Sequence, residues 1–85
     1  MSELTTRQRR ALEVLAGYRD GCTEAIILAH GFSLDLMVEL VHAGLATAHV
    51  ESVVTGRRTM QVTHWRITDA GRKALAQARA RKRRS

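Results

Sequence analysis

The chain contains no proline, a single cysteine and only three aromatic residues. One cysteine excludes an intramolecular disulfide and a cysteine-rich zinc site. No apolar run approaches the ~20 residues that a membrane-spanning helix needs. The N-terminal segment MSELTTRQRR has no apolar signal core, so we expect a cytoplasmic protein without membrane contact. A chain of 85 residues is long enough for one domain, and its core must be small.

Acidic residues are the minority, with 8 Asp and Glu against 14 Lys and Arg, which gives a net charge of +6. The excess lies at the C-terminal end, in five residues: Arg79, Arg81, Lys82, Arg83 and Arg84. Without these five, nine basic residues face eight acidic ones, a net of +1. We therefore divide the chain into a domain, 1–78, and a basic tail, 79–85. Such a cluster is typical of a nucleic-acid contact, and equally of a solvated helix end.

Three helices are predicted in the first half of the chain. The first covers residues 6–19, where Thr5 and Gln8 form a capping-box pattern. Its apolar face consists of Ala11, Leu12, Leu15 and Tyr18, and Arg7, Arg9 and Arg10 lie toward the other side. The second begins after Thr23 and ends at Gly31, with a buried strand as the alternative for its apolar run.

The third predicted helix covers residues 34–43, with Ser33 as its cap and Gly44 at its end. Its inward stripe consists of Leu36, Met37, Leu40 and Val41. Helical phase leaves six positions outward: Ser33, Leu34, Asp35, Val38, Glu39 and His42.

Two strands, 46–54 and 60–67, are predicted next, and a short loop that contains Gly56 joins them into a hairpin. Arg57 and Arg58 lie on that loop. A hairpin that closes symmetrically around Arg57 would direct His49 and His64 to opposite faces, so we expect no metal site. Thr68 and Asp69 then begin a last helix, whose thin apolar stripe is Ala70, Ala74, Leu75 and Ala78.

This order resembles the winged helix-turn-helix family, especially the small MarR-like and PadR-like bacterial regulators. The matching segments are LTTRQR at 4–9, the turn around 31–33, LVHAGL at 40–45 and ITDAGR at 67–72. The resemblance implies an α+β winged helix: three bundled helices that include a helix-turn-helix, a two-stranded hairpin as the wing, and a C-terminal helix.

The resemblance also implies a transcriptional regulator that binds double-stranded DNA, and in many such regulators a homodimer. Helix three would lie at the major groove, and Arg57 and Arg58 would contact the minor groove or phosphate. Arg7 and the basic tail would contact the phosphate backbone. The pattern specifies no operator and no small-molecule effector.

The outward face of helix three departs from the family pattern. Asp35 and Glu39 repel phosphates, and Leu34 and Val38 offer apolar contacts alone. The alternative function is therefore a winged helix that binds a protein partner or itself through this surface. No phosphate loop or catalytic motif is present in the sequence, so we expect neither an enzyme nor a cofactor.

Overall fold

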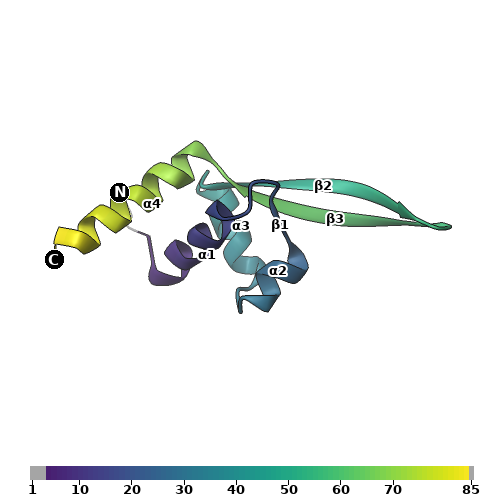
Figure 1. Cartoon of the computed structure of the whole chain (residues 1–85), viewed down its shortest axis with the longest axis horizontal. Helices are drawn as coiled ribbons and strands as arrows, with labels where there is room; N and C mark the ends of the chain where they lie inside the picture. The colour runs from purple at the N-terminus through teal and green to yellow at the C-terminus, as the bar shows by residue number, and fades with distance from the viewer. Residues whose placement is uncertain (1–3, 85) are drawn as a thin grey trace.

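The computed structural model describes residues 4–84, and the side chains of residues 4–80. This part of the chain forms an α+β domain of four helices and one three-stranded antiparallel sheet (Figure 1), so the predicted fold class is confirmed at that level. The elements, in chain order, are α1 (Thr6–Ala16), β1 (Cys22–Thr23), α2 (Glu24–Ala29), α3 (Leu34–His42), β2 (Ala46–Thr55), β3 (Arg58–Ile67) and α4 (Asp69–Arg84).

Helix α1 has the predicted capping box, in which Thr5 and Gln8 each accept from the other's backbone N–H, at 2.9 and 3.0 Å. The predicted end at residue 19 is wrong, because the helix stops at Ala16. The N–H groups of Gly17 and Tyr18 bond to carbonyls only three residues back, which tightens and ends the last turn. Tyr18 therefore lies beyond the helix and is 40% exposed, not part of the core.

Helices α2 and α3 begin at the predicted caps. Thr23 Oγ1 accepts from the N–H of Ile26 at 3.4 Å, and Ser33 Oγ accepts from the N–H of Leu36 at 3.2 Å. Gly31, with φ +83°, follows α2 in the left-handed conformation that glycine adopts without strain. The apolar run 25–29 is therefore helical, and the strand alternative is wrong. Helix α3 ends one residue before the predicted position.

The short strand β1 has no counterpart in the sequence prediction. It pairs with β3, with Cys22 opposite Trp65 and Thr23 opposite His64, which gives the strand order β1-β3-β2. Two residues are too few for an alternating pattern to be visible in a sequence. The buried Cys22 and Trp65 attach the α1–α2 connection to the base of the hairpin.

The hairpin is longer and its loop shorter than predicted. Strands β2 and β3 pair from Ala46–Ile67 to Thr55–Arg58, so the turn consists of Gly56 and Arg57 alone. Gly56 has φ +61° and Arg57 has a negative φ, which matches a type II′ turn. The centre of the hairpin thus falls between Gly56 and Arg57, and the predicted register is wrong. His49 lies directly opposite His64, so the two imidazoles share one face.

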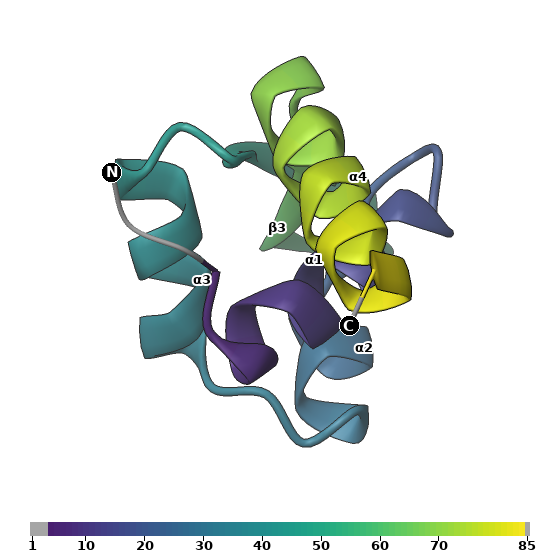
Figure 2. The same ribbon diagram turned by 90° about the vertical axis from the view of Figure 1, so that its left-hand side faces the viewer.

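The core lies between the helices and the base of the sheet (Figure 2). Its buried residues are Ala11, Leu12 and Leu15 of α1, Cys22, Ile27, Leu36, Met37, Leu40, Ala46, Trp65 and Leu75. The predicted phase of α3 is confirmed, because all six outward positions are exposed. By contrast, the hairpin projects beyond the core, and every residue from 47 to 61 is exposed. We call residues 47–61 the hairpin arm.

A close joint connects the ends of α3 and β3. Thr68 Oγ1 donates to the Gly44 carbonyl at 2.7 Å and accepts from the N–H of Gly71 at 3.0 Å. The N–H of Thr68 donates to the Leu45 carbonyl at 3.1 Å. A Cβ at Gly71 would collide with that same carbonyl oxygen and would lie 2.7 Å from Ile67 Cγ1. Gly71 is buried and Ala70 is exposed, so the predicted place of Ala70 in the apolar stripe is wrong.

We expect Leu40→Ala to lower the free energy of unfolding by about 2–5 kcal/mol, because Leu40 is fully buried and the substitution leaves a cavity. Val38→Ala is the matched control, since Val38 lies on the same helix and is 52% exposed. Urea denaturation of both variants checks the prediction. Similar losses in the two variants would contradict the inward placement of Leu40.

Gly71→Ala should destabilise the domain by about 1–3 kcal/mol, as overpacked sites do, although alanine is the better helix former. The added methyl group would force the Leu45 carbonyl and α4 apart. Gly17→Ala is the control, because its φ is −82° and its nearest contact would be an ordinary 3.5 Å. Thermal melts should show a lower midpoint for Gly71→Ala alone, and a neutral Gly71→Ala would refute the close joint.

Candidate nucleic-acid interface

The outer face of α3, which we define as Leu34, Asp35, Val38, Glu39 and His42, is a single exposed surface on one helix. Leu34 is 37% exposed and Val38, one turn further on, is 52% exposed. Helical phase places both carboxylates, Asp35 and Glu39, along one side of these apolar side chains. Ser33 is also exposed, but its hydroxyl is engaged as the cap of α3. This face carries no Lys or Arg, so it supplies apolar contacts and negative charge.

The two predicted contact arginines lie in the hairpin turn and directly after it, so the predicted loop position of Arg58 is wrong. Arg57 is the second residue of the turn, and Arg58 begins β3 opposite Thr55. Both are exposed at the far end of the hairpin arm. Two adjacent guanidinium groups at a projecting turn can bind phosphate oxygens without displacing any packed side chain. The geometry of the loop therefore keeps these arginines available.

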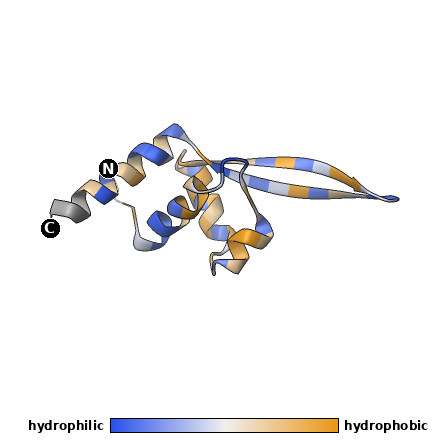
Figure 3. Ribbon diagram, viewed as in Figure 1, coloured by the Kyte–Doolittle hydropathy of each residue, from blue (hydrophilic) through white to orange (hydrophobic). Residues whose placement is uncertain are grey.

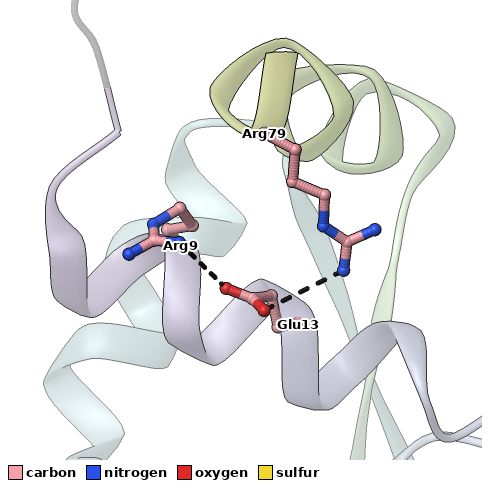
Figure 4. Close-up of polar contacts among 3 residues, drawn as sticks. All are labelled: Arg9, Glu13 and Arg79. Carbon is pink, nitrogen blue, oxygen red and sulfur yellow. Dashed lines mark hydrogen bonds and ion pairs between the residues drawn. The ribbon is translucent and has the colours of Figure 1, made fainter. Parts of the chain in front are cut away.

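Two other predicted cationic residues lie near helix α1. Arg7 is exposed on α1, whereas Arg79 of α4 is joined to α1 by an ion pair, with Nη2 3.9 Å from Glu13 Oε2. The second oxygen of Glu13 lies 3.5 Å from Arg9 Nη1, so one carboxylate holds two guanidinium groups (Figure 4). Sequence reasoning missed this contact because no local pattern links residues 13 and 79.

The candidate residues do not form one continuous patch. The molecule measures 55 Å along its longest axis, with the hairpin turn at one end and the C-terminal part of α4 at the other (Figure 1). Helix α4 continues through Arg84, so residues 79–84 of the predicted tail are helical. The side chains of Arg81, Lys82, Arg83 and Arg84 lie outside the described residues. The structure thus separates the hairpin arginines from the basic end of α4.

Three polar side chains gather on one face of the hairpin. His64 Nε2 lies 3.5 Å from Glu51 Oε2, and His49 is paired with His64 across the strands. His64 Nδ1 is buried, and it has no hydrogen-bond partner among the described side chains. Within the part of the chain with described side chains, no group of three or more His, Cys, Asp or Glu has the arrangement to hold a metal ion.

The Cys22 thiol is fully buried, and burial raises its pKa above the ordinary value. The thiol therefore stays protonated at neutral pH and serves as a small apolar side chain. Among residues 4–84, no helix is both long enough and apolar enough to cross a membrane.

Comparison with known proteins finds no matching protein-family model, no matching curated sequence and no matching solved structure.

Proposed function

We propose that this protein is a winged helix-turn-helix domain that binds duplex DNA as a small transcriptional regulator. The observation that carries the proposal is the pair Arg57–Arg58 at the turn of an exposed, projecting hairpin. The element order supports it as well, because α2 and α3 are joined by a four-residue connection and the hairpin follows α3 directly.

In this proposal the hairpin is the wing and its arginines contact the minor groove or the adjacent phosphates. Arginine suits both positions, since a narrow minor groove attracts guanidinium groups and phosphates accept paired hydrogen bonds from them. Helix α3 lies toward the major groove, and Arg7 and the basic end of α4 contact the phosphate backbone. The outer face of α3 adds negative charge and therefore contributes no attraction to phosphate. Most of the affinity then comes from the phosphate contacts of the arginines and lysines elsewhere.

A second candidate function is the recognition of a protein partner through the outer face of α3. The exposure of Leu34 and Val38 favours it, since apolar side chains one turn apart form a continuous strip on a helix. Asp35 and Glu39 beside this strip would select a partner with basic residues. The two candidate functions predict different results when both carboxylates are neutralised. DNA binding by α3 predicts a change in duplex affinity, and recognition of a protein partner predicts a change in the capture of that partner.

Replacement of Arg57 and Arg58 by alanine should weaken binding to a random duplex and reduce the salt slope by about 0.9 for each phosphate that the arginines neutralise. Both residues are exposed, so the free energy of unfolding should change by less than about 0.5 kcal/mol. The measurement is a fluorescence-anisotropy titration at several salt concentrations.

The control for charge alone is Arg72→Ala with Lys73→Ala, which removes two exposed cations from α4. The hairpin variant should bind the duplex more weakly than this control. Equal affinities of the two double variants would mean that net charge, and not the hairpin turn, governs binding.

The double variant Asp35→Asn, Glu39→Gln should bind random duplex more tightly if α3 lies at the major groove, because two charges that repel phosphate disappear. Ser33 keeps its capping bond, so helix α3 should persist. Asp20→Asn with Glu24→Gln is the control, with the same change in net charge outside α3. Unchanged duplex affinity of the α3 variant, together with altered capture of a protein partner, would favour the second candidate.

A further inference from the structure

The outer edge of β2 is a long strand edge with little protection beyond the single carboxylate of Glu51. The strand order β1-β3-β2 leaves β2 at the edge of the sheet among the described residues. Its ten residues, ATAHVESVVT, contain no proline, glycine, lysine or arginine, and they pair with β3 without a bulge. Natural edge strands are normally shielded by such residues, by bulges or by a covering element.

The hairpin arm also lacks a supporting layer. A two-stranded ribbon is at best marginally stable in water, and further strands or a packed face are needed to hold it. All side chains of the arm are exposed, among them Val50 at 58%, Val54 at 72% and Met60 at 54%. Figure 3 shows apolar residues alternating with polar ones along both strands. A partner strand would reduce this exposure.

The register determines which backbone groups the free edge presents. Thr55 and Arg58 flank the two-residue turn, so they form a hydrogen-bonded pair. Such pairs alternate along an antiparallel ladder, and Val50 therefore belongs to the set whose N–H and C=O point away from β3. Ala48 and Ser52 present their backbone groups to the same edge. The middle of β2 thus offers donors and acceptors in the spacing that another antiparallel strand needs.

We propose that β2 pairs with β2 of a second copy of this chain, antiparallel and two-fold symmetric about Val50. The two sheets then become one, with the strand order β1-β3-β2-β2-β3-β1. Symmetry places Val50 opposite the partner's Val50, and His49 opposite the partner's Glu51 on both sides of the axis. An imidazole N–H can donate to a carboxylate in each of these two pairs. The strand is therefore complementary to itself in charge, in apolar contact and in its backbone groups.

The neighbouring registers lack this complementarity. A two-fold axis at Glu51 puts two carboxylates directly opposite each other, and an axis at His49 pairs two imidazoles and leaves Glu51 opposite Thr47. Like charges directly opposite destabilise paired strands. In the proposed register, Glu51 stays beside His64 of its own chain, from which it is 3.5 Å away, and gains His49 of the partner. Charge thus selects the axis at Val50.

Cysteine cross-linking tests the register. In the proposed dimer the two Cα atoms of position 50 lie about 5.5 Å apart, within the range of a disulfide. Val54 is the matched control, an exposed valine on the same face of the same strand. The two copies of position 54 would be eight residues apart along the ladder, or about 27 Å. Val50→Cys should form a covalent dimer on mild oxidation, and Val54→Cys should remain monomeric on a non-reducing gel.

Sedimentation velocity without nucleic acid tests the edge itself. The unmodified chain should shift from monomer to dimer as its concentration rises. Val50→Pro should prevent dimer formation, because proline removes the backbone N–H that faces the free edge. The backbone hydrogen bonds between β2 and β3 do not use that N–H and remain. Val50→Thr, which keeps the N–H and the β-branch, should retain the dimer, and circular dichroism checks that both variants stay folded.

A chain that stays monomeric at every concentration overturns the proposal, as does a Val50→Pro variant that is folded and still dimeric. The register is overturned if Val54→Cys cross-links as efficiently as Val50→Cys. It is also overturned if neither variant cross-links. The proposal is independent of DNA binding, because neither experiment contains DNA. Failure of the dimer leaves the hairpin arginines unaffected, and failure of DNA binding leaves the strand pairing unaffected.

Discussion

The carbonyl of Leu45 is the point on which the arrangement of this domain depends. It accepts the N–H of Thr68, and the missing side chain of Gly71 leaves it room. The neighbouring Gly44 carbonyl accepts the Thr68 hydroxyl. The end of α3, the two strand bases and the start of α4 are thereby joined within a few residues. This joint sets the direction of α4, which brings Leu75 into the core and Arg79 to Glu13.

Features encoded by neighbouring residues could be predicted from the sequence. The capping groups of Thr5, Thr23 and Ser33 act within three residues, and the structure contains all three. The inward phase of α3 follows from apolar spacing alone, and it is confirmed by the burial of Leu36, Met37 and Leu40. Such signals need no knowledge of the rest of the chain.

Features that depend on distant residues could not be predicted in the same way. The hairpin register depends on whether the loop has two residues or an odd number of residues. The two-residue loop shifts the pairing by one position from the predicted register, and His49 therefore faces His64. The close packing of Gly71 has no local signal in the sequence, because its partner, Leu45, is 26 positions away in the chain. The same distinction holds for the candidate site. The exposure of the outer face of α3 was predictable from local spacing, but the ion pair between Glu13 and Arg79 was not.

The hairpin arm has a uniform ladder, no bulge and a turn of two residues, and these properties make it a spacer of adjustable length. Deletion of two successive cross-strand pairs, which we call rungs, removes four residues. It would shorten the arm by about 7 Å and keep every remaining side chain on its original face. Deletion of a single rung would instead turn the tip over. Because the arm is exposed throughout, such changes would leave the core intact. Evolution can therefore move the tip arginines outward or inward in steps of about 7 Å.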